Sequence, residues 1–184
     1  MQQAEQTIVR DVVLVGGGHS HAVLLRMFAM NPIAGVRLTL ICRDTHTPYS
    51  GMLPGYLAGH YQYDDVHIDL DRLATFAGAR FLRDDVVGID RQNRRVLCRN
   101  RPPMNYDLLS INIGSTPATG KTPGADQYSV PVKPINRFND RWQAMLERVE
   151  ASRSSMRIAI VGGGAGGVEL MLAMHHRLTG DLRA

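Results

Sequence analysis

A run of three glycines between two apolar stretches is the feature that most constrains how this chain can fold. The aliphatic run 12–15 leads directly into Gly16, Gly17 and Gly18, and the helix-compatible run 22–30 follows. The first glycine permits a sharp turn off a strand, and Gly18 has no Cβ that would keep a phosphate away from the backbone. A helix beginning near Ser20 would direct free N–H groups at that phosphate. The order strand, glycine turn and helix is typical of a dinucleotide-binding βαβ unit.

The pattern recurs near the end of the chain, where the apolar run 156–161 precedes G-G-G-A-G-G-V-E. Gly162, Gly164 and Gly167 complete a G-x-G-x-x-G motif there. The first copy departs from this motif, because its third glycine position holds His21. That glycine normally allows the helix to pack closely on the strand. We therefore expect the His21 side chain either to point outward or to force a wider approach.

Composition and charge are those of an ordinary globular protein. The chain is 44% hydrophobic and 21% charged, with a net charge of +4. Its one basic cluster lacks interleaved aromatic residues, which predicts a solvated hairpin and no nucleic-acid partner. We expect a cytoplasmic protein, because there is no membrane-spanning apolar run and no signal peptide. Cys42 and Cys98 form no C-x-x-C motif, so neither a redox dithiol nor a zinc site is indicated.

Periodicity and turn signals give a coarse order of elements. We expect strands at 9–15, 36–42, 106–113 and 156–161, an antiparallel hairpin from strands 80–90 and 95–99, and helices at 20–30, 69–77 and 135–152. Residues 44–63 are interpreted as a long connecting loop. Five methionines on apolar helix faces are predicted to lie in the core: Met27, Met30, Met145, Met171 and Met174.

The second strand ends where a dinucleotide site usually has an acidic residue that binds the ribose. Here the position holds Cys42, then Arg43, then Asp44. Either Asp44 takes that role from two positions later, or Arg43 contacts the adenosine.

Together, these stretches resemble the pyridine-nucleotide-disulfide oxidoreductase superfamily, and most closely its FAD-containing NADH-dehydrogenase-like branch, which includes an enzyme sometimes fused to selenophosphate synthetase. The similarity lies in V-L-V-G-G-G-H-S-H-A, P-Y-S-G-M-L-P-G-Y, Y-D-L-L-S-I-N-I-G-S-T-P, V-K-P-I and I-V-G-G-G-A-G-G-V-E-L. The resemblance implies an α/β fold: a Rossmann-like FAD-binding domain over 1–117, its parallel sheet carrying an antiparallel hairpin insertion, a linker over 118–134, and the start of a Rossmann-like NAD(P)-binding domain over 135–184.

The resemblance also implies roles for individual residues. Gly114, Ser115 and Thr116 would return the chain across the FAD site, and Lys133 would lie near the flavin unless it is only a surface cation. Ser50 and Gly51 belong to a segment that either covers the flavin ring or is a purely structural loop. Glu169 either stabilises its helix by charge or lies near the junction of flavin and nicotinamide. His19 and His21 are interpreted as loop histidines near a phosphate or the flavin, with no metal role.

These observations predict an FAD-dependent oxidoreductase that takes hydride from NAD(P)H and passes electrons to a small-molecule or quinone-like acceptor. No catalytic acid or base is identified. The alternative is a non-catalytic nucleotide-binding module or an incomplete fragment, because a single strand and helix of the second motif cannot bury their own faces. The sequence leaves the oligomeric state open, a homo-oligomer included, and we expect the 184 residues alone to bind FAD more weakly than a longer parent.

Overall fold

The computed structural model describes residues 7–152 and 156–180, which form two compact units. Unit 1 comprises Met1–Thr47 and Ile68–Gly114, and unit 2 comprises Pro48–His67 and Ser115–Ala184. This division into two units differs from the domain boundaries expected from the sequence. Residues 48–67, which those boundaries place in the first domain, belong to unit 2 together with the C-terminal part of the chain. No helix within the described ranges is both long and apolar enough to cross a membrane.

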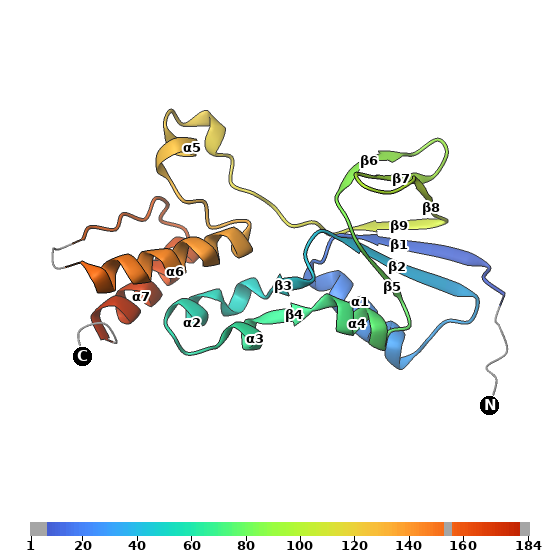
Figure 1. Ribbon diagram of the computed structural model, residues 1–184, viewed down its shortest axis with the longest axis horizontal. Helices are drawn as coiled ribbons and strands as arrows, with labels where there is room; N and C mark the ends of the chain where they lie inside the picture. The colour runs from blue at the N-terminus through green and yellow to red at the C-terminus, as the bar shows by residue number, and fades with distance from the viewer. Residues whose placement is uncertain (1–6, 153–155, 181–184) are drawn as a thin grey trace. The chain divides into compact units, whose positions relative to one another are not determined.

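Unit 1 is built on a parallel four-stranded sheet with the order β5-β2-β1-β9 (Figure 1). These strands are β1 (Arg10–Val15), β2 (Val36–Cys42), β5 (Arg80–Arg83) and β9 (Leu108–Ile111). The central strand β1 pairs in parallel with both β2 and β9. Continuous apolar runs are what a parallel sheet covered on both faces requires, so the predicted α/β fold class is confirmed.

Two layers cover this sheet, as Figure 1 shows. Helices α1 (His19–Met30) and α4 (Leu70–Phe76) lie side by side on one face, where Leu25 of α1 is fully buried in one cluster with Leu14 and Leu40 of the sheet. The other face packs against a small antiparallel sheet of β6 (Val86–Asp90), β7 (Arg95–Cys98) and β8 (Met104–Asn105). Its Val96 is fully buried against Val13 and Ile41.

The expected long strand at 80–90 is wrong, because the chain divides it between two sheets. β5 joins the parallel sheet beside β2, and β6 pairs antiparallel with β7. Asp84 lies at the division, with its side chain fully buried. Its carboxylate accepts hydrogen bonds from Arg101 Nε at 2.9 Å and from the side chain of Asn100 at 3.1 Å. Burial alone would raise the pKa of Asp84, but the bond from Arg101 and those from the backbone amides of Asp85 and Asn100 outweigh it and hold the pKa below its ordinary value.

The segment interpreted as a long loop is mostly regular structure. It contains β3 (His46–Pro48), the 3₁₀ turn η1 (Ser50–Met52) and α2 (Leu53–Leu57). After α3 (Tyr63–Val66), strand β4 (His67–Asp69) pairs with β3 in a two-stranded sheet. Pro54 in the first turn of α2 is compatible with a helix start, since its missing N–H would have no partner there.

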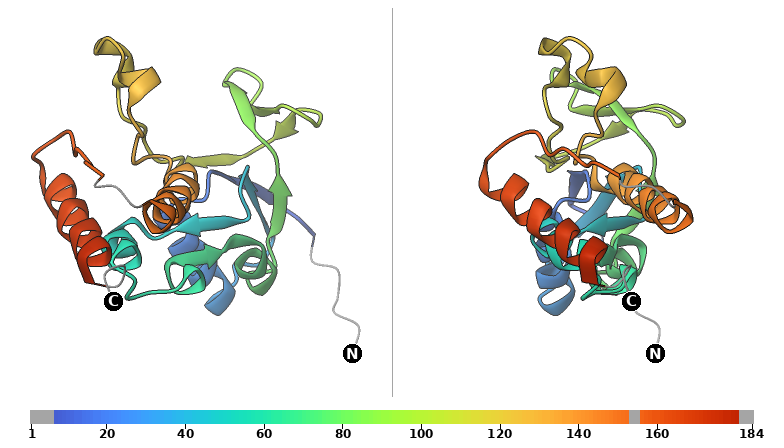
Figure 2. Two further views of the ribbon diagram at one scale, coloured as in Figure 1. Left: turned by 60° about the vertical axis from the view of Figure 1, so that its left-hand side comes forward. Right: turned by 90° about the vertical axis from the view of Figure 1, so that its left-hand side faces the viewer.

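Unit 2 has a helical core instead of a sheet. Its elements after α2 and α3 are η2 (Thr119–Lys121), α5 (Ala125–Tyr128), α6 (Ile135–Ala151) and α7 (Ala165–Gly180). Helix α6 lies where the sequence predicts a helix at 135–152, and its apolar face with Phe138, Trp142 and Leu146 is buried in this core. Leu170 and Ala173 of α7 complete it, and Figure 2 shows α7 running beside α2.

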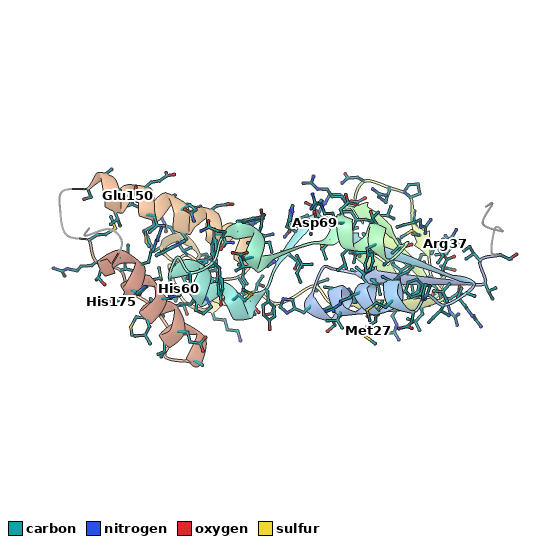
Figure 3. The ribbon with its side chains drawn as sticks, turned by 90° about the horizontal axis from the view of Figure 1, so that it is seen from below. Met27, Arg37, His60, Asp69, Glu150 and His175 are labelled. Atoms are coloured by element: carbon teal, nitrogen blue, oxygen red, sulfur yellow. The ribbon has the colours of Figure 1, made fainter. Side chains whose placement is uncertain are left out.

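The strand expected at 156–161 does not form, and these residues lie exposed without regular structure. A strand needs a neighbour for its backbone N–H and C=O groups, and within the described ranges this segment is paired with none. Three of the predicted core methionines are also solvent-exposed: Met27, Met30 and Met171. Met27 lies on the outer side of α1 in Figure 3. Met145 and Met174 do pack against the core of unit 2.

Candidate functional site

The glycine turn lies at the carboxyl end of β1, the edge at which ligands bind in open parallel sheets. The Gly16 amide donates to the carbonyl of Ile41 at 2.8 Å, and Gly16 adopts a positive φ of 92°. Gly18 is the N-cap of α1 in an extended conformation, with φ −66°. The helix has neither a side-chain cap nor an acidic residue in its first turn. Its positive dipole end is therefore not neutralised by the protein, which suits an anion.

At each of the three glycines, other protein atoms occupy the space that a Cβ would need. A Cβ on Gly16 would overlap the backbone carbonyl of Asn112, and one on Gly18 would overlap the Asn112 side chain. A Cβ on Gly17 would overlap Leu70 at the start of α4. Within the turn only Gly16 has a positive φ. A side chain at Gly18 is therefore excluded by lack of space and not by the backbone conformation.

His21 points inward, so the expected alternative in which its side chain points outward is wrong. Its side chain is 1% exposed. The Nδ1 atom lies 2.6 Å from the Gly16 carbonyl oxygen, and Nε2 lies 2.9 Å from the Ser110 hydroxyl on β9. Both ring nitrogens are thus used within the protein. Burial lowers the pKa of His21, so the imidazole is neutral at pH 7.

The end of β2 lies beside this turn. The Cys42 sulfur is close to Gly17, and burial raises the pKa of the Cys42 thiol, so it stays protonated at neutral pH. Arg43 is exposed, and its guanidinium lies 3.4 Å from the Asp44 carboxylate. The two candidates for the ribose position therefore pair with each other at the rim of the turn.

The other predicted site residues divide between the two units. In unit 1, His19 is half-buried and Ser20 exposed in the first turn of α1, and Gly114 has a positive φ of 78°. In unit 2, Lys133 Nζ donates to the Ser115 hydroxyl at 3.4 Å. The remaining predicted residues of unit 2 are exposed or half-buried: Ser50, Gly51, Thr116, Gly162, Gly164, Gly167 and Glu169.

The second glycine motif forms its turn even though its strand is absent. Gly162 has a positive φ of 117°, and a Cβ on Gly167 would overlap the Gly162 carbonyl. The Val168 amide donates to the Gly164 carbonyl at 3.1 Å. At the third glycine position of this motif, the first turn of α7 therefore lies directly against the backbone of the glycine turn.

Sequence reasoning missed the residues of β9 and its extension that hold the first turn. The Asn112 carbonyl accepts the Gly18 amide at 3.0 Å, and Ser110 contacts His21. A signal was available, since Ser110 and Asn112 are polar residues two apart in an apolar strand, and such residues share one face. That alternation predicts a polar contact on the side facing α1.

Comparisons with known proteins agree with this arrangement. A family model described as pyridine nucleotide-disulphide oxidoreductase matches residues 10–179. The NADH dehydrogenase-like protein YutJ of Bacillus subtilis is 27% identical over 170 residues, which cover 88% of this chain and 44% of that protein. The external alternative NAD(P)H-ubiquinone oxidoreductase B4, mitochondrial, of Arabidopsis thaliana is 24% identical over 193 residues, covering 94% and 33%. The chain thus spans less than half of the length of these two curated relatives.

Among solved structures, NDH2 of Plasmodium falciparum in complex with NADH superposes with a TM-score of 0.71. The match covers 89% of this chain and 36% of that one, at 18% sequence identity. At this identity the likeness demonstrates a shared fold.

Proposed function

Because the chain belongs to the pyridine nucleotide-disulphide oxidoreductase family, we propose that its first glycine turn binds FAD in a flavoprotein that oxidises NAD(P)H. The observation that carries the proposal is the turn Gly16–Gly18, which leads from the carboxyl end of β1 into an uncapped helix. NADH- and NAD(P)H-oxidising relatives support the same reaction class.

The residues present fit two parts of an adenine dinucleotide, its central pyrophosphate and its adenosine ribose. The turn and the first amides of α1 would hold the pyrophosphate, because no side chain caps the helix and its first turn has no acidic residue. Arg43 and Asp44 would lie at the ribose, since both follow β2 directly. A flavin held there supplies the redox chemistry, accepting a hydride from NAD(P)H and passing the electrons on.

The proposed acceptor is quinone-like. Relatives supporting this are named as NAD(P)H-ubiquinone oxidoreductases and as a demethylphylloquinone reductase. The second motif, with its exposed Gly162 and Gly164, is proposed to contact NAD(P)H. We do not expect it to be a working site in these 184 residues, because residues 156–161 form no strand within the described ranges.

The experiment compares two glycine-to-valine variants. Gly18→Val is expected to abolish FAD binding, because the new side chain fills space taken by Asn112 and by the approaching phosphate. Gly163→Val is the matched control, since a Cβ there meets no atom within 4 Å. Flavin fluorescence quenching gives the Kd, and circular dichroism reports whether each variant is folded.

A folded Gly18→Val protein that binds FAD like the unmodified chain would refute the assignment of the phosphate site. Anaerobic NADH addition to the flavin-loaded protein tests the reaction class through bleaching of the flavin. Bleaching of the flavin absorbance supports an oxidoreductase over a nucleotide-binding module. Retained colour agrees with the expectation that the second motif is not a working site in these 184 residues.

A further inference from the structure

The buried imidazole of His21 stands where the second glycine motif has Gly167. In the second motif, close approach of backbone to backbone brings the helix against the turn. In the first motif, a side chain takes the place of that contact. His21 lies in the first turn of α1 and reaches both Gly16, before the helix, and Ser110 on β9. It thereby connects three segments of unit 1 at one point.

The chemistry of its two partners fixes which nitrogen carries the proton. A backbone carbonyl can only accept a hydrogen bond, so the Nδ1 atom 2.6 Å from the Gly16 oxygen must be the protonated one. In the neutral ring Nε2 is then an acceptor, and the Ser110 hydroxyl 2.9 Å away donates to it. Burial disfavours the charged ring, which agrees with this arrangement.

The bond from Nδ1 has a direct effect on the turn. A peptide unit is planar and trans, so fixing the direction of the Gly16 carbonyl also fixes the Gly17 N–H, which points the opposite way. Gly16 itself has a positive φ, a region in which glycine has wide conformational freedom. The backbone bonds of Gly16 to Ile41 and of Gly18 to Asn112 hold the two ends of the turn. His21 holds the carbonyl side of the peptide between them, and the Gly17 N–H on its other side bonds to the Cys42 sulfur.

We propose that His21 is a positioning residue, whose Nδ1–H bond to the Gly16 carbonyl orients the glycine turn for a dinucleotide pyrophosphate. The inference rests on the proposed function, because the pyrophosphate is that of FAD. His21 does not contact the phosphate itself, since both of its nitrogens are used within the protein.

Three substitutions separate the two bonds of the imidazole. In His21→Asn the side-chain amide nitrogen takes the place of Nδ1 and keeps a donor to Gly16. In His21→Gln the amide reaches the place of Nε2, so the contact with Ser110 is kept and the bond to Gly16 is lost. Ser110→Ala removes only the second bond.

We expect His21→Gln to weaken FAD binding about tenfold, the equivalent of one lost hydrogen bond. His21→Asn and Ser110→Ala should each stay within about threefold, even where thermal stability falls. Imidazole ¹⁵N shifts of the unmodified chain at pH 7 should show the neutral ring protonated at Nδ1. Amide exchange at Gly17 should accelerate in His21→Gln and not in His21→Asn.

An imidazole protonated at Nε2, or equal FAD affinities for the Asn and Gln variants, would overturn the proposal. Failure of the unmodified chain to bind FAD would instead contradict the proposed function. In that case the ring tautomer and the order of Gly17 exchange rates still decide whether His21 orients the turn.

Discussion

Replacing Gly16 by alanine is expected to destabilise unit 1 through two separate effects. The first is conformational, because Gly16 has a φ of 92°, where residues with a Cβ are strained. The second is steric, because the new Cβ would overlap the carbonyl of Asn112. That carbonyl cannot move aside easily. The Asn112 amide bonds to Val15 at 2.8 Å, and its oxygen accepts the Gly18 amide at 3.0 Å.

The structure supports a rough magnitude for the loss. A residue held in a sparsely populated backbone region costs about 1–3 kcal/mol. Forcing an extra carbon into a packed site costs about 1–3 kcal/mol more. Gly78→Ala is the matched control in the same unit, since Gly78 has a φ of 61° and a Cβ there meets no atom within 4 Å. The control should lose only about 1–2 kcal/mol, the ordinary penalty of the left-handed region.

Urea unfolding followed by far-ultraviolet circular dichroism measures both variants against the unmodified chain. Gly16→Ala should lose about 2 kcal/mol more free energy of unfolding than Gly78→Ala. Similar losses in the two variants would show that the Asn112 carbonyl does not limit the turn, and the packing account of Gly16 would fail.

Two further predictions concern aspartates of unit 1. The Asp69 carboxylate accepts hydrogen bonds from the backbone amides of Asp71 and Arg72 at 3.0 Å each. Asp69→Ala should therefore lower the free energy of unfolding, measured by urea titration, by about 0.5–2 kcal/mol. An unchanged free energy of unfolding would contradict the capping role of Asp69. The pKa of Asp84 is lower in the folded than in the unfolded chain, so its stabilisation is present above pH ~4 and lost as the pH falls through the folded pKa. Thermal melts of Asp84→Asn should therefore show less dependence on pH between about 5 and 2 than the unmodified chain, and an unchanged dependence would exclude Asp84 as the source.

Local sequence patterns predicted the elements whose stability is decided within a few residues. β2 occupies the predicted residues 36–42, and α4 begins directly after its cap Asp69. The apolar face of α6 follows from helical periodicity alone. In the first glycine turn, the strand before it and the helix after it are likewise encoded next to each other in the chain.

Which strand pairs with which neighbour could not be predicted from the same local patterns. The run 80–90 is compatible with one strand, but the buried Asp84 divides it through bonds to Asn100 and Arg101, which lie 16 and 17 residues further along. The run 156–161 has the composition of a strand and forms none, because strand formation depends on a neighbour with matching backbone groups.

The candidate site shows the same division between sequence and tertiary structure. The glycines by themselves predicted that a tight turn would join β1 to α1, since a positive φ and a close approach of backbone to backbone favour residues without a Cβ. Only the folded chain decided that His21 points inward and that Asn112 packs against the turn. Both contacts join β1 and α1 to β9, about 90 residues away in sequence. The pairing of β1 with β9 decides which polar side chain contacts which carbonyl across that separation. That pairing cannot be predicted from the local sequence.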